Sequence, residues 1–353
     1  MSTLRFGMVG CGGISYAHGG AAQSLADRVK FTTCCDVVPS ATQSWVREYG
    51  EMAEYLDYND MFAKEEMDAV VLATWPNQHL DQIRDCLAAG HKRILCEKSL
   101  EVTGERAYEI FKLAQANDAT IMEAFMYRHH PAMLRMRELV DRGEVGTVDS
   151  VRACFSAFDD ETEDPTNPNR NWRQRKECGG GIPYDFACYC VNAIRFFADS
   201  VPARVRCYGG KGVYDTINRM YAVIEFENGV VGILESSKKE DFTQEVQVNG
   251  HKGILDLPMS WTIPHGFKST ITRSTTQNWS DRMFDNYMVE SADPYACQMA
   301  NFLDVLEGKA DQRLPLAESV VNVFTIEALV KSIEEDREVV LDIPADVKAA
   351  LAK

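Results

Sequence analysis

The fold of this chain is decided by residues 4–15, LRFGMVGCGGIS, near the start of its 353 residues. The apolar first half predicts a buried strand, and a helix is expected to follow, to about residue 29. Between them, Gly10, Gly12 and Ser15 match a G-x-G-x-x-S variant of the dinucleotide-binding fingerprint. The first glycine allows the tight turn, the second lets the backbone approach a pyrophosphate, and Ser15 is small enough for close packing of helix on strand. An ordinary glycine-rich bend is the alternative, but this order of elements favours a dinucleotide site.

An acidic residue stands where a dinucleotide site needs one. The next predicted strand, residues 30–35, ends at Asp36, 24 residues after Gly12. A carboxylate there can hold the ribose hydroxyls and repels a 2′-phosphate, so Asp36 favours NAD over NADP. Ser40 could contact a phosphate, which leaves NADP open.

Strands and helices continue to alternate as far as residue 124. Further strands are expected at 68–73, 93–96 and 120–124 with helices between them, which predicts an α/β fold with a doubly wound parallel sheet. Ligands of such sheets collect at the carboxyl ends of the strands. The predicted cofactor site comprises the groups at these ends: Gly10, Gly12, Gly13, Ile14, Asp36, Thr74, Pro76, Asn77, His79, Glu97 and Lys98.

A second chemical motif lies in the middle of the chain. Residues 179–181 are three glycines, and they lead into a predicted helix that carries Asp185 and Tyr189. Residues four apart share one face of an α-helix. A carboxylate beside a phenol, behind a glycine-rich entry, suggests a substrate clamp with a proton donor. The alternative is a core tyrosine and a charge at a helix start.

Lys98 is the chemical candidate of the first half. A lysine at a strand end facing the cofactor can hydrogen-bond a substrate hydroxyl, and its charge can lower the pKa of a nearby phenol. A solvated surface lysine is the alternative reading of the same position.

From about residue 145 the pattern changes to alternating strands. A strand at 147–158 is followed by a polar loop at 159–176 that carries Trp172 and Arg173, and five more strands are expected between 204 and 257. Together they predict a mostly antiparallel sheet with helices on one face, so its other face is expected to associate. We therefore expect two domains: residues 1–124 bind NAD(P), and residues 125–353 bind substrate and form the oligomer.

Composition excludes several function classes. The net charge is −16, from 53 acidic against 37 basic residues, which disfavours nucleic acid and anionic membranes as partners. No secretory signal and no apolar run of about 18 residues are present. The eleven cysteines are scattered and contain no CxxC, so reduced thiols in the cytoplasm are expected and no metal site is implied.

The ordered motifs resemble those of the Gfo/Idh/MocA family of oxidoreductases. They are G-x-G-G-I at 10–14, T-x-P-N-x-H at 74–79, E-K at 97–98, M-E-A-F-M-Y-R at 122–128, G-E-V-G at 143–146 and G-G-G-x-x-x-D-x-x-x-Y at 179–189. The resemblance is strongest to the branch of glucose–fructose oxidoreductase, xylose dehydrogenase and dimeric dihydrodiol dehydrogenase, because Tyr189 stands where other members have histidine. It implies catalytic roles for Lys98, Asp185 and Tyr189.

The resemblance also implies a pocket, partners and a class of reaction. Arg128, Trp172 and Arg173 are expected to join Lys98, Asp185 and Tyr189 in binding a sugar, polyol or cyclic diol. A homodimer or homotetramer through the second sheet is implied, as is an NAD(P)-dependent dehydrogenase acting on CH–OH groups. Cofactor-retaining sugar oxidoreductases, redox-assisted glycoside-cleaving enzymes and non-catalytic NAD(P)-sensing proteins are the alternatives.

One departure from the family pattern concerns the residue after Lys98. The family has proline there, often after a cis bond, and this chain has Ser99. A cis bond before a residue other than proline costs about 3 kcal/mol, so we expect the Lys98–Ser99 bond to be trans.

Overall fold

The computed structural model describes residues 3–167, 171–264, 266–278 and 281–351. Contacts divide the chain into two compact units. Unit 1 contains residues 1–101, 105–129 and 293–320, and unit 2 contains residues 102–104, 130–292 and 321–353. Segment 293–320, which the predicted domain boundary places in the second domain, packs in unit 1.

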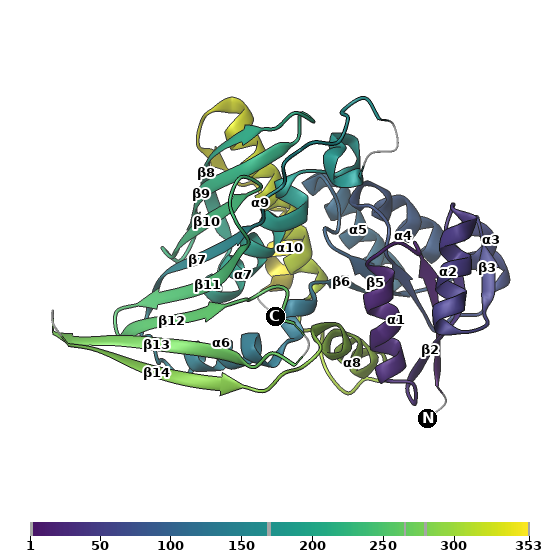
Figure 1. Ribbon diagram of the computed structural model, residues 1–353, viewed down its shortest axis with the longest axis horizontal. Coiled ribbons are helices and arrows are strands. Elements are labelled where there is room, and N and C mark those ends of the chain that lie inside the picture. Colours follow the sequence, from purple (N-terminus) through teal and green to yellow (C-terminus); the bar gives the residue numbers. More distant parts are fainter. Residues whose placement is uncertain (1–2, 168–170, 265, 279–280, 352–353) are drawn as a thin grey trace. The chain divides into compact units, whose positions relative to one another are not determined.

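Unit 1 is built on a six-stranded parallel sheet with the order β3-β2-β1-β4-β5-β6 (Figure 1). The predicted strands all form, and β3 with α3, which follow residue 50, were not predicted. Its elements are β1 (Leu4–Val9), α1 (Ser15–Ser24), β2 (Val29–Cys35), α2 (Pro39–Tyr49), β3 (Ala53–Tyr55), α3 (Tyr58–Lys64), β4 (Ala69–Leu72), η1 (Pro76–Gln78), α4 (His79–Ala88), β5 (Arg93–Glu97), α5 (Gly104–Asn117), β6 (Thr120–Ala124), η2 (Met126–His129) and α8 (Pro294–Leu306).

Helix α1 is five residues shorter than predicted. It ends at Ser24, because the Leu25 and Arg28 amides close turns onto Ala22 and Leu25. Val29 then begins β2, so the residue taken as the end of a helix is the start of a strand.

Helix α8 joins unit 1 through its apolar face. Asp293 caps its first turn by accepting the Tyr295 amide, and Met299, Phe302 and Leu303 enter the same core as Phe6. The rings of Phe6 and Phe302 meet edge to face, with 6.0 Å between their centroids. A segment near the end of the chain thus completes the core under β1.

Unit 2 is built on a nine-stranded sheet with the order β14-β13-β12-β11-β7-β10-β9-β8-β15. The neighbours β7 and β10 are parallel, and the other neighbours are antiparallel. Its elements are α6 (Pro131–Asp141), β7 (Val148–Ser156), η3 (Trp172–Gln174), η4 (Lys176–Cys178), η5 (Pro183–Ala187), α7 (Cys188–Ala198), β8 (Pro202–Lys211), β9 (Ile217–Phe226), β10 (Val231–Ser237), β11 (Thr243–Gly250), β12 (Gly253–Pro258), β13 (Ser269–Asn278), β14 (Asp281–Val289), α9 (Leu316–Glu335), β15 (Val339–Val340) and α10 (Ala345–Leu351).

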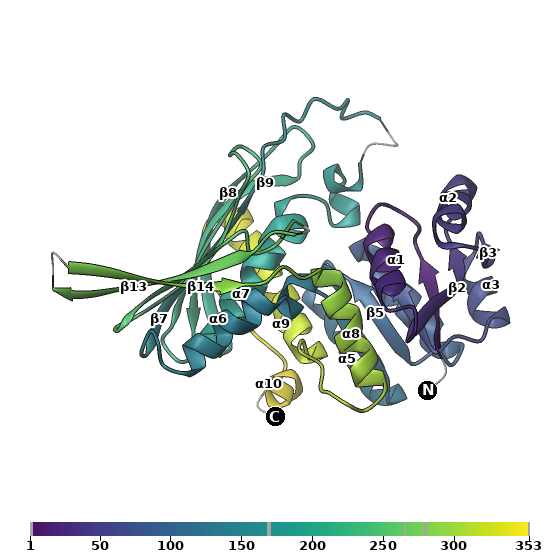
Figure 2. The same ribbon diagram turned by 60° about the horizontal axis from the view of Figure 1, so that its bottom comes forward.

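One face of the nine-stranded sheet is covered by helices, and α6, α7 and α9 lie on the same side of it in both views (Figures 1 and 2). Along β9, buried and exposed residues alternate strictly from residue 218 to residue 226, as a strand with one covered face requires. The predicted α/β fold with a parallel sheet followed by a large mostly antiparallel sheet is confirmed. Within the described residues, no helix combines the length and apolar character needed to cross a membrane.

Candidate active site

The glycine turn after β1 leaves open space where a cofactor would bind. Gly10 has φ of +91°, and a Cβ on it would lie 2.7 Å from the Ala73 carbonyl oxygen, so only glycine fits. A Cβ on Gly12 or Gly13 would meet no atom within 4 Å. The Ser15 hydroxyl donates to the Gly12 carbonyl over 2.6 Å and so turns inward. The backbone amides at the start of α1 can therefore be reached by a phosphate.

Asp36 lies directly beside this turn. Its Oδ2 accepts the Cys11 amide and its Oδ1 accepts the Val38 amide, each over 2.8 Å. Each carboxylate oxygen has a second lone pair, which a ribose hydroxyl can use. The residues present fit a dinucleotide: Gly12, Gly13 and Ile14 would hold its pyrophosphate, and Asp36 would hold its ribose.

His79 lies in the interior of unit 1, and its role toward a cofactor stays a prediction. The ring is fully buried, with Nδ1 3.0 Å from the Ser99 carbonyl and Nε2 3.3 Å from the Thr74 carbonyl. Burial lowers the pKa of His79, so the ring is neutral and has a single N–H to donate to one of these carbonyls. His79 therefore links the loop after β4 to the loop after β5.

The other predicted residues of this loop have local partners. The Thr74 hydroxyl donates to Gln82 Oε1 over 2.6 Å, and the Asn77 carbonyl accepts Arg106. Pro76 is buried at the first position of η1. These contacts fix the loop's backbone and leave its cofactor role a prediction.

Glu97 and His18 form a buried pair at the end of β5. His18 Nε2 lies 2.8 Å from Glu97 Oε1, and the two side chains are 1% and 6% exposed. The Lys98 amide donates to Glu97 Oε2 over 3.1 Å. Glu97 thus fixes the backbone from which the half-buried Lys98 extends.

The Lys98–Ser99 peptide bond is cis, so the expected trans bond is wrong. The prediction used the intrinsic preference of an isolated peptide. In the fold, the surrounding backbone is fixed by tertiary hydrogen bonds: the Ser99 carbonyl faces His79 and the Leu100 amide donates to Glu123 over 2.7 Å. Local preference alone does not determine this loop.

In unit 2, glycines bring the turn at η3 against the start of the mid-chain helix. The Gly181 amide donates to the Arg173 carbonyl over 2.8 Å, and a Cβ on Gly180 would lie 2.7 Å or less from the carbonyl oxygens of Trp172, Arg173 and Arg175. Any side chain at Gly180 would push the two segments apart.

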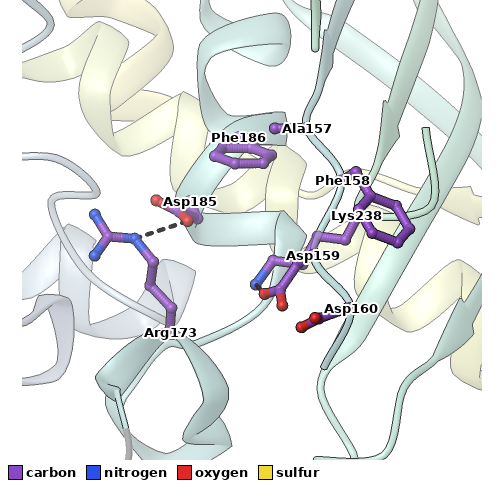
Figure 3. Close-up of a pocket in the computed structure, with 8 residues that line it drawn as sticks. All are labelled: Ala157, Phe158, Asp159, Asp160, Arg173, Asp185, Phe186 and Lys238. Carbon is purple, nitrogen blue, oxygen red and sulfur yellow. Dashed lines mark hydrogen bonds and ion pairs between the residues drawn. The ribbon is translucent and has the colours of Figure 1, made fainter. Parts of the chain in front are cut away.

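This close approach places Arg173 beside Asp185. Arg173 Nε donates to Asp185 Oδ2 over 2.9 Å, and the carboxylate is 3% exposed (Figure 3). The Arg173 guanidinium also lies 4.8 Å from the centre of the Trp172 ring. Three predicted substrate-binding residues are therefore together.

The helix that carries Asp185 and Tyr189 begins with a π-helical turn. Residues 183–187 form η5 and the α-helix proper starts at Cys188, whereas a uniform α-helix was predicted. Single π turns often occur at functional sites. The Tyr189 ring is 6% exposed and packs against Phe155 and Trp261, with centroids 5.5 and 5.9 Å away.

A pocket of about 510 Å³ opens beside Asp185 (Figure 3). It is lined by Ala157, Phe158, Asp159, Asp160, Arg173, Asp185, Phe186 and Lys238. Sequence reasoning missed the Lys238–Asp159 ion pair, whose Nζ and Oδ2 are 3.2 Å apart. Tyr189 is not among the lining residues. The volume suits a small organic ligand.

Arg128 has structural partners in unit 1. Its side chain is 2% exposed, 3.5 Å from Glu318, and it donates to the Arg313 carbonyl over 3.2 Å. Arg128 does not line the pocket of unit 2. Likewise, Lys98 belongs to unit 1, and Asp185 and Tyr189 belong to unit 2. Among the described residues, no cluster of three or more His, Cys, Asp or Glu could hold a metal ion.

The dinucleotide turn and the two sheets define an oxidoreductase with a Rossmann domain. Residues 4–125 match the model described as oxidoreductase family, NAD-binding Rossmann fold, and residues 133–256 match the GFO/IDH/MocA C-terminal domain. The chain belongs to the Gfo/Idh/MocA family of oxidoreductases, as its motifs predicted, and contains that family's NAD-binding Rossmann domain.

Relatives match over nearly the whole chain. A D-xylose 1-dehydrogenase (NADP(+)) of Haloferax volcanii is 29% identical over 357 residues, covering 96% of this chain and 100% of its own. An inositol 2-dehydrogenase of Rhizobium meliloti is 25% identical over 352 residues, covering 96% and 99%. A levoglucosan dehydrogenase solved with NADH and L-sorbose has a TM-score of 0.85 at 18% identity, covering 98% of this chain and 100% of that one, which supports the fold.

Proposed function

We propose that this enzyme transfers a hydride between NAD(P) and a hydroxyl-bearing carbon of a sugar, polyol or cyclic diol, with Tyr189 and Lys98 as its acid–base pair. Asp185 holds the substrate together with Arg173 and Trp172. The observation that carries this proposal is the pocket at Asp185, at the head of the helix that bears Tyr189. The xylose and inositol dehydrogenases among the relatives support the substrate class.

In the proposed oxidation, Tyr189 takes the hydroxyl proton of the substrate while the Lys98 ammonium stabilises the phenolate. The carbon loses its hydride as the carbonyl forms, so one proton and one hydride leave. The chemistry that the nicotinamide supplies when bound is acceptance of that hydride. Asp36 favours NAD, and residues 1–124 and 125–353 take the cofactor and the substrate respectively.

The direct test removes the proton-transfer groups one at a time. Tyr189→Phe and Lys98→Met are each expected to lower kcat by about 100-fold or more, because positioned acid–base groups contribute that much. Matched controls are Tyr58→Phe, which loses a phenol bonded to Asp85, and Lys92→Met, an exposed lysine before β5. Reduced-nicotinamide absorbance with a panel of sugars and diols gives the rates.

Near-full turnover by both Tyr189→Phe and Lys98→Met would refute the acid–base assignment. Tight NAD binding with no turnover of any sugar or diol would instead support a non-catalytic sensor. Retention of the reduced cofactor after one turnover would indicate a cofactor-retaining sugar oxidoreductase. Cleavage of glycosides would indicate an enzyme that oxidises its substrate transiently in order to break the glycosidic bond.

We also propose that copies of this chain associate through the uncovered face of the nine-stranded sheet. Tyr208 pairs with Tyr221, and Val223 pairs with Ile233, in the strand register of that face. These four side chains are 37–62% exposed. Contiguous exposed apolar side chains on a sheet favour association. Eleven free cysteines, nine of them buried, are consistent with the cytoplasm as the proposed location.

A further inference from the structure

The pocket of unit 2 lies where two parallel strands end together. The hydrogen bonding between the two segments continues past the end of β7. The Ala157 amide donates to the Ser237 carbonyl over 3.0 Å, and the Asp159 amide donates to the Lys238 carbonyl over 2.9 Å. Asp159 and Lys238, 79 residues apart, therefore lie together at the carboxyl ends of these two strands. Figure 3 shows them on the opposite side of the pocket from the Arg173–Asp185 pair.

Lys238 and Arg173, the two cationic side chains of this pocket, have N–H groups that make no hydrogen bond within the described residues. The Lys238 side chain is 8% exposed, and one of its three N–H groups goes to Asp159. Its other two have no partner in the described parts of the chain. Arg173 uses Nε for Asp185, and its terminal nitrogens likewise have no hydrogen-bond partner there. A buried ion pair contributes little net stability by itself.

The pocket is lined by more carboxylate side chains, which accept hydrogen bonds, than by cationic side chains. Asp159, Asp160 and Asp185 face the pocket against two cations, Arg173 and Lys238. A hydroxyl group both donates and accepts hydrogen bonds, so adjacent hydroxyls match alternating ammonium and carboxylate groups. A phosphate or carboxylate only accepts, and it would be repelled by the excess negative charge.

The Asp159 carboxylate is ionised at neutral pH. Burial raises its pKa, but hydrogen bonds from the Glu161 amide and the Lys238 ammonium outweigh burial and bring the pKa below its usual value. The acceptor therefore persists in mildly acidic solution.

Aromatic rings supply the apolar part of the pocket. Phe158 is 66% exposed at its rim. Phe186 also lines the pocket, and its ring stacks on Phe155 with 4.5 Å between the ring centroids. Flat aromatic faces suit the C–H faces of a saturated ring.

We propose that this pocket binds an uncharged polyhydroxylated ring, such as a neutral sugar or cyclitol, and that the Lys238–Asp159 pair selects it against anionic sugars. The proposal rests on the proposed dehydrogenase function and names its substrate class. Lys238 donates to one ring hydroxyl, and Asp159 accepts from a neighbouring hydroxyl and repels carboxylates and phosphates.

The test measures binding separately from turnover. Calorimetry with NADH-saturated full-length enzyme compares D-glucose, D-xylose and myo-inositol with D-glucuronate, D-glucose 6-phosphate and UDP-glucose. At least one neutral ring is expected to bind about tenfold or more tightly than its charged analogues. Lys238→Met is expected to weaken neutral binding about tenfold, and Asp159→Asn to raise the affinity for glucuronate relative to glucose by a similar factor.

The control is Lys239→Met, which breaks the neighbouring Lys239–Glu161 pair of 2.9 Å outside the pocket lining and should leave sugar affinity unchanged. Circular dichroism confirms folding, and if Lys238→Met does not fold, Asp159→Asn alone decides. Preference for anionic sugars, no binding of any ring, or unaltered selectivity in Asp159→Asn would overturn the inference. If neutral rings bind and their affinity depends on Lys238, but no nicotinamide is reduced, the inference about the pocket holds and the dehydrogenase proposal fails.

Discussion

The backbone N–H of Cys11 donates to Asp36 Oδ2 over 2.8 Å, which ties the glycine turn after β1 to the carboxylate that ends β2. The other oxygen of Asp36 accepts the Val38 amide, also over 2.8 Å. Asp36 therefore has two roles. It fixes the conformation of the turn, and it offers its remaining lone pairs to a ribose.

Replacing Asp36 should change the choice of cofactor. Asp36→Ser is expected to weaken NAD binding about tenfold to hundredfold, since hydrogen bonds to a charged group contribute roughly 1.5–3 kcal/mol. NADP should be affected less, because the repulsion of its 2′-phosphate disappears. Fluorescence titration of NADH and NADPH measures both affinities, with the exposed Asp27→Ser as control. An unchanged ratio of the two affinities would contradict the ribose assignment.

His129 should make the enzyme sensitive to acid. Burial, with the charges of Arg313 and Arg128, lowers its pKa from 6.5 to about 3. Between these values the unfolded chain binds one more proton, so stability falls as the pH falls, by roughly 1.4 kcal/mol per pH unit. In His129→Gln, urea unfolding at several pH values should give a shallower slope. The same slope in both proteins would show that His129 does not contribute.

Asp256 should have the opposite effect. Burial, with the charge and hydrogen bond of Glu245, raises its pKa from 3.8 to about 7. Between these values the folded state binds more protons, so stability falls as the pH rises. Because Asp256 is half-exposed, the expected gain in Asp256→Asn above neutrality is on the order of 1 kcal/mol. Thermal unfolding at about pH 5 and pH 8 measures it, with the exposed Asp149→Asn as control. An equal gain in stability at both pH values would exclude the titration of Asp256 as its cause.

A single introduced charge can test whether copies of this chain associate through the uncovered face of the nine-stranded sheet. Val223→Glu replaces an apolar side chain of that face, between Ile233 and Arg206 in the strand register, by a carboxylate. Burying a charged group in an interface is expensive, so the oligomer should dissociate. Analytical ultracentrifugation measures the mass, and Leu56→Glu, at an exposed residue of unit 1, is the control. If wild type is a monomer, the association proposal fails.

Thiol reactivity should be confined to two positions. All eleven cysteines are free, and only Cys154 and Cys297 are half-buried. Burial raises the pKa of Cys154 to about 11, so even this thiol should react slowly. Iodoacetamide labelling followed by mass spectrometry should find these two sites first. Rapid labelling of Cys11 or Cys35 would indicate opening of the region around the glycine turn.

Regular periodicity was enough to predict most of the fold. The strands of unit 1 read as apolar runs, and the strands of unit 2 read as alternating ones, as buried and half-buried strands should. The strands that were missed include β3, β13 and β14. Two of them carry neither signal, because β3 has three residues of mixed exposure and β14 is mostly exposed. The family, the enzyme class and the NAD-binding domain were also predicted correctly.

The roles of the candidate site residues stay predictions, although the structure shows where these residues lie. Arg173, Trp172 and Asp185 come together. The buried Arg128 contacts Glu318 and the Arg313 carbonyl. The buried His79 contacts backbone carbonyls. Such contacts depend on side-chain orientation, which spacing along the chain does not encode.

By itself, the sequence determined the glycine turn, the acid at Asp36 and the order of strands and helices, because each depends on residues close together in the chain. The tertiary structure alone decided the cis bond at Ser99 and the pairing of Lys238 with Asp159 across 79 residues. Such features depend on which distant segments pack together, and packing is a property of the whole fold.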